Sequence, residues 1–252
     1  MKSIILAAGR GSRMGALTED RPKCLVELDG CPLLDLQCAA LVAGGAEEIA
    51  VVTGYRGECI AVRGLRCFTN PRWQQTNMVM SLHTAREWLQ RETCIVSYSD
   101  IFYPAETIRR LVAAQGDIVI SFDPDWLQIW QGRFADPLAD AETFRRDGAG
   151  RLVEIGGKAS HVDQIEGQYM GLLRFTPSGW ACVEEYLNGL RPEEQDRLDM
   201  TGLLSRLIAR GVRIDTVPTF PGWGEIDSET DTAWYEEQIR LGCLSIYRPS
   251  AG

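Results

Sequence analysis

No apolar run in this sequence approaches the roughly 20 consecutive residues that a membrane-spanning helix requires. The eight cysteines stand singly in the 252-residue chain, without a CxxC pair or a regular framework. Such cysteines are typical of reduced core thiols rather than of disulfides or zinc ligands. The first residues also lack the long apolar core of a signal peptide. Together these absences predict a cytoplasmic protein with no membrane partner.

Positive charge is scarce, with 26 Lys and Arg against 35 Asp and Glu and a net charge of -9. This balance argues against a nucleic-acid partner. Arg10, Arg13, Arg21 and Lys23 nevertheless lie close together near the N-terminus. A local basic cluster in an acidic chain indicates a small anionic ligand.

Strand and helix patterns alternate in the first half of the chain. Apolar, β-branched runs occupy 3–8, 48–54, 93–100 and 117–123, and helical patterns occupy 33–44, 77–90 and 105–115. Continuous apolar strands separated by helices are typical of a mostly parallel sheet covered on both faces. We therefore expect an α/β fold with a Rossmann-like, mostly parallel sheet flanked by helices.

The alternation lapses after residue 124. The patterns there predict a hairpin at 147–157, strands at 168–176 and 212–219, and helices at about 179–189 and 200–211. We interpret this part as a β-hairpin elaboration on one sheet, so residues 1–252 are expected to form a single domain.

The stretch "IILAAGRGSRMG" places glycines and arginines directly after the first strand. Ligands of open parallel sheets bind beyond the carboxyl ends of the strands. Gly9 and Gly11 let backbone N–H groups approach an anion, and Arg10 and Arg13 can neutralise phosphate charge. The loop is neither a P-loop nor a GxGxxG turn followed by an uninterrupted helix. A nucleoside triphosphate fits it; a plain glycine-rich turn with solvated arginines is the alternative.

The longer segment "LAAGRGSRMGALTEDRPKCLVEL" (6–28) resembles the signature of the nucleotidyltransferase family that includes sugar-1-phosphate nucleotidyltransferases and phosphocholine cytidylyltransferase. The family pattern is LAAGxGxRM, a spacer and PKxL. The resemblance implies that the first motif wraps the nucleotide base and phosphates and that Lys23 reaches the phosphates. The residues concerned are Leu6, Ala7, Ala8, Gly9, Arg10, Gly11, Ser12, Arg13 and Met14.

The turn "TNMVMSL" lies beside the nucleotide in related enzymes, which makes Thr76, Asn77 and Ser81 nucleotide-site candidates. Thr76 or Asn77 can equally cap the following helix, and the two roles are compatible. Ser99, in the "SD" pair after the fourth strand, is the last nucleotide-site candidate.

Two aspartates are candidate metal ligands. Asp100 ends the fourth apolar strand, and Asp227 lies in "WGEIDSETD". Phosphoryl-transfer sites bind Mg²⁺ through one or two carboxylates together with substrate phosphates. A helix cap or a turn is the alternative for Asp100 alone. The resemblance implies a metal-binding aspartate at both positions, so Asp100, Asp227, Lys23 and Arg13 form the expected catalytic set with Mg²⁺.

Later motifs resemble the branch that makes CMP-linked phosphonates and phosphocholine, with 2-aminoethylphosphonate-type cytidylyltransferases most alike. They include "WLQIWQGRFADPLADAETF" (126–144), "EIGGK" (154–158) and "IEGQYMGLLRF" (165–175). Arg133 and Lys158 could bind a phosphonate. The other acceptor-site candidates, which could hold an amine or wall the pocket, are Asp136, Asp140, Glu142, Glu166, Trp130 and Tyr169. Trp126 and Trp130 could instead be a helical core pair, and "DPLADAETF" a solvated turn.

The expected reaction transfers CMP from CTP to a small phosphonate and releases pyrophosphate. Residues of about 1–123 would then bind the nucleotide, and about 124–252 would bind the acceptor and complete the metal site. The first alternative is transfer to phosphocholine or a sugar 1-phosphate; the second is a non-catalytic nucleotide-sensing module. The sequence leaves the oligomeric state open, a homodimer included.

Overall fold

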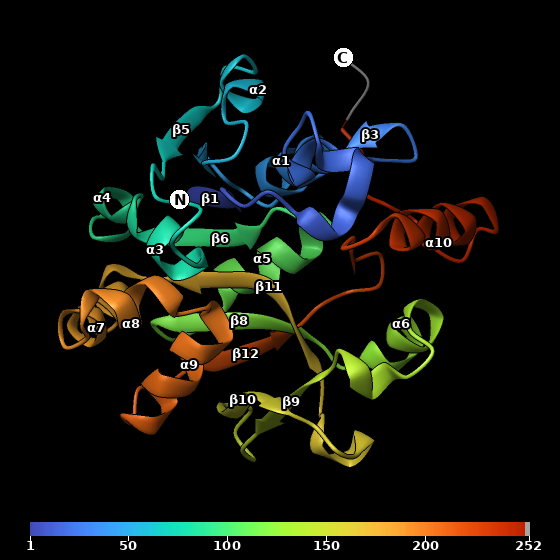
Figure 1. The fold of residues 1–252 in the computed structure, drawn as a ribbon. Coiled ribbons are helices and arrows are strands. Elements are labelled where there is room, and N and C mark those ends of the chain that lie inside the picture. The colour runs from blue at the N-terminus through green and yellow to red at the C-terminus, as the bar shows by residue number, and fades with distance from the viewer. Residues whose placement is uncertain (250–252) are drawn as a thin grey trace.

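A seven-stranded mixed sheet organises the computed structural model, which describes residues 1–249. Its strand order is β12-β8-β11-β6-β1-β4-β5, and strands from both halves of the chain share it (Figure 1). The strands are β1 (Lys2–Ala7), β2 (Glu27–Leu28), β3 (Cys31–Pro32), β4 (Glu48–Thr53), β5 (Arg66–Thr69), β6 (Cys94–Tyr98), β7 (Ile101–Phe102), β8 (Ile118–Asp123), β9 (Glu142–Arg146), β10 (Leu152–Lys158), β11 (Gln168–Phe175), β12 (Asp215–Pro218) and β13 (Gly224–Glu225).

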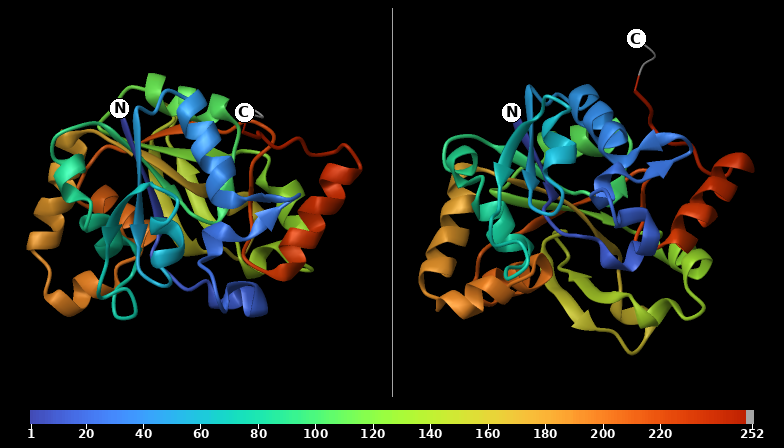
Figure 2. Two further views of the ribbon diagram at one scale, coloured as in Figure 1. Left: turned by 90° about the horizontal axis from the view of Figure 1, so that it is seen from above. Right: turned by 45° about the horizontal axis from the view of Figure 1, so that its top comes forward.

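Helices cover both faces of this sheet (Figure 2). The α-helices are α1 (Leu33–Ala43), α2 (Glu58–Ala61), α3 (Met78–His83), α4 (Arg86–Leu89), α5 (Ala105–Ala113), α6 (Trp126–Arg133), α7 (Pro177–Asn188), α8 (Pro192–Arg197), α9 (Met200–Ala209) and α10 (Glu229–Arg240). The 3₁₀ turns are η1 (Ser12–Thr18), η2 (Lys23–Leu25), η3 (Pro137–Ala139) and η4 (Val162–Gln164). None of the helices in residues 1–249 has the length and apolar character that crossing a membrane requires.

The first strand shows why the sheet is buried on both sides. Ile4 and Leu6 pack into one apolar cluster with Trp180, whereas Ile5 joins the opposite cluster with Leu41. Successive side chains of a strand point to opposite faces, so a continuous apolar run needs a core on each face. The predicted α/β architecture is confirmed.

One strand breaks the parallel arrangement. β1, β4, β5 and β6 run parallel to one another, and β8 runs parallel to β12. β11 lies between β6 and β8 and runs antiparallel to both. The sequence predicted β11 as a strand but did not predict its direction or its central place.

Two predicted elements differ in detail, and a helix was missed. The helix expected over 77–90 is two short helices, because the Thr84 hydroxyl donates to the Ser81 carbonyl and Ala85 leaves helical geometry. The hairpin begins earlier than 147–157, since "DGAGR" forms its turn between β9 and β10: Asp147 Oδ1 accepts from the N–H groups of Ala149 and Arg151. Helix α10 was not predicted.

Candidate functional site

The opening loop closes tightly over Lys23. Gly11 has a φ of 68°, and a Cβ there would lie 3.0 Å from the Lys23 Cβ, so only glycine fits. The Gly11 carbonyl accepts from the N–H of Met14 and from the Thr18 hydroxyl. Local geometry therefore fixes the loop and the lysine relative to each other.

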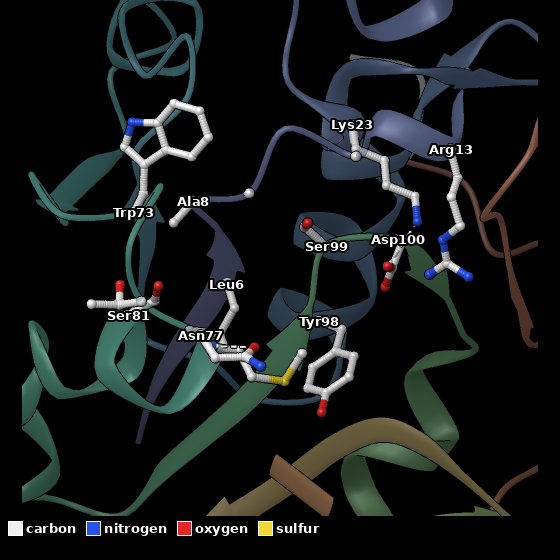
Figure 3. A pocket seen from close by; sticks show the side chains of 14 residues that line it. Leu6, Ala8, Arg13, Lys23, Trp73, Asn77, Ser81, Tyr98, Ser99 and Asp100 are labelled. Atoms are coloured by element: carbon white, nitrogen blue, oxygen red, sulfur yellow. Dashed lines mark hydrogen bonds and ion pairs between the residues drawn. The ribbon is translucent and has the colours of Figure 1, made fainter. Parts of the chain in front are cut away.

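A cavity of about 320 Å³ lies beyond the carboxyl ends of β1 and β6. Its lining residues are Leu6, Ala8, Gly9, Gly11, Arg13, Lys23, Trp73, Thr76, Asn77, Met78, Ser81, Tyr98, Ser99 and Asp100. We call it the nucleotide cavity. Figure 3 shows Trp73 and Ser81 on one side and Lys23, Arg13 and Asp100 on the other. An aromatic wall opposite a charged one suits a base joined to phosphates.

Four of the predicted nucleotide residues lie outside this lining. Ala7 and Met14 are buried in the apolar core, because the strand and the turn that carry them point these side chains inward. Ser12 is exposed, and the exposed Arg10 guanidinium lies 5.7 Å from the centre of the Tyr55 ring. Ala7 and Met14 therefore position the loop rather than face the cavity.

Two predicted turn residues are held by a buried amide that the sequence did not single out. Asn70 Nδ2 donates to Thr76 Oγ1 at 2.9 Å and to Ser81 Oγ at 3.0 Å. Asn77 caps α3 by accepting the N–H of Met78, as one of the two interpretations predicted. Trp73 was also missed; its place just before "TNMVMSL" was the available signal.

Three carboxylates meet at the edge of the nucleotide cavity. One oxygen from each of Asp100, Glu225 and Asp227 lies within 4.8 Å of the others. Pairing of β13 with β7, extended by the Ile226 N–H donating to the Asp100 carbonyl at 2.8 Å, brings these distant segments together. Glu225 was missed, although an extended strand places residues two apart on the same face.

Two cations contact the aspartates of this cluster. The buried Lys23 ammonium donates to Asp100 Oδ2 at 2.9 Å and also to Asp227 Oδ1, and the exposed Arg13 guanidinium donates to Asp227 Oδ1 at 3.1 Å. Burial alone would lower the pKa of Lys23, but the charges of Asp100 and Asp227 outweigh it and raise that pKa above its ordinary value. Lys23 is thus held protonated.

Arg133 Nη1 contacts the third member, Glu225 Oε2, at 3.2 Å, and one carboxylate oxygen of the cluster still lacks a partner. Asp100 Oδ1 is buried without a hydrogen-bond partner. Desolvation and then the charges of Asp227 and Asp100 raise the pKa of Glu225 to about 8. Three carboxylates, one of which has an oxygen without a hydrogen-bond partner, provide the oxygen ligands that a hard divalent cation prefers. The cluster is consistent with a divalent metal site.

A second cavity of about 250 Å³ adjoins the first and shares Arg13, Met78 and Tyr98 with it. We call it the acceptor cavity. Its other lining residues are Trp130, Asp140, Glu142, Gln168, Tyr169, Asp199, Met200, Thr201, Glu225 and Asp227. Trp130, Asp140, Glu142 and Tyr169 were predicted; Asp199 and Thr201 were missed, because α9 approaches the hairpin only in the fold. Trp130 Nε1 and Tyr169 Oη are buried without a hydrogen-bond partner.

Four predicted acceptor residues do not line this cavity. The Arg133 side chain is fully buried: Nε and Nη2 bond Asp231 at 2.9 and 3.2 Å, and Nη1 bonds Glu225 at 3.2 Å. The Arg133 guanidinium is therefore paired with carboxylates inside the protein and does not face the acceptor cavity. Asp136, Lys158 and Glu166 are exposed; Asp136 caps η3, and Glu166 bonds the N–H of Arg146.

Known proteins resemble this arrangement. The family model described as the MobA-like NTP transferase domain matches residues 3–162. The chain belongs to this family. The solved structure of the inositol-1-phosphate CTP transferase from T. maritima has a similar fold, with a TM-score of 0.72, 18% identity and 97% of each chain covered.

Two relatives of this MobA-like chain are more similar in sequence. One is the CTP:phosphoglutamine cytidylyltransferase of Campylobacter jejuni, 34% identical over 92% of this chain and 97% of the relative. The other is the CMP-5'-(3-aminopropyl)phosphonate synthase of Streptomyces rubellomurinus, 31% identical over 94% of this chain and 36% of that longer protein. The expectation of a nucleotidyltransferase is confirmed.

The buried Arg133 leads to a stability prediction for this MobA-like domain. Replacing Arg133 with Met should lower the free energy of unfolding by about 3–5 kcal/mol, because Asp231 keeps its buried charge without a partner and Glu225 loses a hydrogen-bond donor. Urea denaturation measures this. Replacing the exposed Arg197 with Met should change stability by less than about 0.5 kcal/mol. Equal effects of the two substitutions would contradict the assigned role.

Proposed function

We propose that this nucleotidyltransferase transfers CMP from CTP to a small phosphonate or phosphorylated acceptor that carries an ammonium group. One observation carries the proposal: Asp140, Glu142 and Asp199 line a cavity that shares Arg13 with the nucleotide cavity. Arg13 is the only Lys, Arg or His among the lining residues of the acceptor cavity, all of which lie in the described chain. The cavity thus offers one cationic end and several carboxylates, which suits a zwitterion.

The charge state of these carboxylates supports the same interpretation. Burial raises the pKa of Asp140, and burial followed by the charge of Asp199 raises the pKa of Glu142. A bound ammonium would relieve both effects. The names of the two relatives support the same interpretation, because phosphoglutamine and an aminopropylphosphonate both carry an amine. Both names also include CTP or CMP.

In the proposed reaction, an acceptor oxygen attacks the α-phosphorus of CTP in line and pyrophosphate leaves, so no covalent enzyme intermediate is needed. Lys23 and Arg13 screen the repulsion between the two anions, and the cavity walls align them. Trp130 Nε1 and Tyr169 Oη are free to donate to the acceptor. Mg²⁺ held by Asp100, Asp227 and Glu225 would supply further charge neutralisation at the triphosphate.

Pyrophosphate release tests the proposal. CTP and UTP are each combined with 2-aminoethylphosphonate, its hydroxyl analogue 2-hydroxyethylphosphonate, phosphoglutamine, phosphocholine and glucose 1-phosphate. We expect CTP to be used with an amine-bearing acceptor, and 2-aminoethylphosphonate is our first candidate. Fastest turnover of glucose 1-phosphate would assign a sugar nucleotidyltransferase instead. Tight CTP binding without turnover of any acceptor would favour a nucleotide-sensing module.

Asp199 allows a sharper test, because its carboxylate also caps α9 by accepting the N–H of Gly202 at 2.7 Å. Asn caps helices as well as Asp does, so Asp199→Asn removes the charge and keeps the helix. We expect kcat/KM for 2-aminoethylphosphonate to fall about 10- to 100-fold, the worth of one hydrogen bond to a charged group. The value for 2-hydroxyethylphosphonate should stay within about twofold, since no ammonium is lost there.

The matched control for this substitution is Glu193→Gln, on the exposed face of α8. It should leave both acceptors unaffected. If Asp199→Asn slows both acceptors equally, Asp199 does not recognise the amine.

A further inference from the structure

A third cavity, of about 380 Å³, shares no lining residue with the nucleotide cavity or the acceptor cavity. Helices α6 and α10, which lie side by side (Figure 2), form two of its walls together with the segment that leads into β13. Its lining residues are Asp123, Asp125, Gln128, Ile129, Thr219, Phe220, Pro221, Gly222, Trp223, Trp234, Tyr235, Gln238, Cys243 and Leu244. The volume falls within the range of about 300–1,000 Å³ that small-molecule pockets occupy.

The carboxylate of Asp123 distinguishes this cavity from an ordinary packing defect. Asp123 is only 5% exposed, yet it forms no ion pair with any described residue. Its Oδ1 accepts the N–H of Asp125 at 2.8 Å and its Oδ2 accepts Trp223 Nε1 at 2.9 Å, which leaves one acceptor position on each oxygen. Burial raises the pKa of Asp123. A buried carboxylate without a counter-ion is costly unless a cation joins it.

The walls of the cavity suit the rest of such a ligand. Four aromatic side chains line it: Phe220, Trp223, Trp234 and Tyr235. Aromatic faces attract organic cations and bury apolar surface. No Lys, Arg or His is among the lining residues, which include a second carboxylate, Asp125. The Arg110 guanidinium lies outside this lining, 3.7 Å from the centre of the Phe220 ring.

We propose that this cavity is a second small-molecule site, which binds an ammonium group attached to an apolar or aromatic body, with Asp123 as its counter-ion. The site lies next to the acidic cluster. Trp223 is followed directly by β13, and the Tyr235 hydroxyl accepts the N–H of Glu225 at 3.1 Å. A ligand packed against Trp223 and Tyr235 therefore contacts the elements that hold Glu225 in place.

Calorimetric titration of the full chain tests the proposal without nucleotide or acceptor, and the substitutions below distinguish this cavity from the acceptor cavity, which is also proposed to bind an ammonium group. The probe is 2-phenylethylamine, and the neutral isostere 2-phenylethanol is its control. We expect saturable binding of the amine with a Kd of about 1 mM or below and at least about tenfold weaker binding of the alcohol. Absence of saturation, or equal affinity for the two compounds, would overturn the proposal.

Two substitutions locate the binding. Asp123→Asn removes the counter-ion, and Gln238→Lys, on the half-buried face of α10, places a competing cation at the cavity without touching Asp123. Each should weaken amine binding by about tenfold or more, and Gln238→Lys serves if Asp123→Asn does not fold. Asp199→Asn should leave amine binding unchanged. Weakening by Asp199→Asn alone would place the amine in the acceptor cavity and refute the second site.

Discussion

Replacing Lys23 with Met is expected to lower kcat/KM about 100- to 1,000-fold, the cost of losing one preorganised electrostatic donor. Lys23 is the buried cation between Asp100 and Asp227 at the edge of the nucleotide cavity. Met retains the apolar stem under Gly11 and removes only the charge. Because that charge acts where negative charge gathers in the transition state, kcat should fall more than the KM for CTP rises. Steady-state pyrophosphate release measures both.

Lys158→Met is the matched control, since this exposed lysine lines neither the nucleotide nor the acceptor cavity. It should stay within twofold of the unmodified protein, and thermal unfolding with Mg²⁺ present should show both variants folded. If the Lys23 variant were as active as the Lys158 variant, Lys23 would have only a structural role, as the ion-pair partner of Asp100 and Asp227.

Replacing Asp227 with Asn should lower turnover at a fixed, subsaturating Mg²⁺ concentration by at least about 100-fold, because the metal is worth several kcal/mol of charge stabilisation. Asp227 contacts Lys23 and Arg13 and belongs to the three-carboxylate cluster. Asn keeps the shape and leaves the backbone N–H of residue 227 bonded to Asp231. The half-saturating Mg²⁺ concentration should rise, and Mn²⁺ binding followed by electron paramagnetic resonance should weaken in parallel.

Asp163→Asn, on the exposed turn η4, controls for the loss of one negative charge. It should leave the metal titration unchanged. An unaltered Mg²⁺ midpoint in the Asp227 variant would exclude that carboxylate from the metal site.

Contiguous features of the site could be predicted from the sequence. Each of these features lies within one short segment of the sequence: the opening loop, Lys23 and the end of β6. Strand patterning and the family signature together therefore identified them. Asp100 and Asp227 were also predicted, and they do meet at one cluster. Local patterning likewise predicted β1, β4, β6 and β8 of the main sheet and the helices α1 and α5, but missed β5 and α2.

What was missed depends on segments that meet only in the fold. Arg133 was expected to bind a phosphonate because it is a cation in a segment that resembles the phosphonate branch; α10 supplies Asp231 as its internal partner. From the sequence, Asp199 would be interpreted only as the N-cap of a helix. The sequence does not show that α9, which it caps, packs on the hairpin and brings Asp199 to the acceptor cavity. Such pairings are set by tertiary contacts, on which hydrophobic periodicity carries no information.

The central place of β11 has a consequence for engineering. This strand comes from the second half of the chain, yet it is hydrogen-bonded between β6 and β8 of the first half. A chimera that exchanged everything after residue 123 with a relative would have to rebuild four strand interfaces in register: β11 with β6 and with β8, β12 with β8, and β13 with β7. If the acceptor cavity sets the acceptor preference as proposed, that preference cannot be exchanged by swapping the second half of the chain. It would have to be changed by side-chain substitutions around the acceptor cavity, with the sheet left intact.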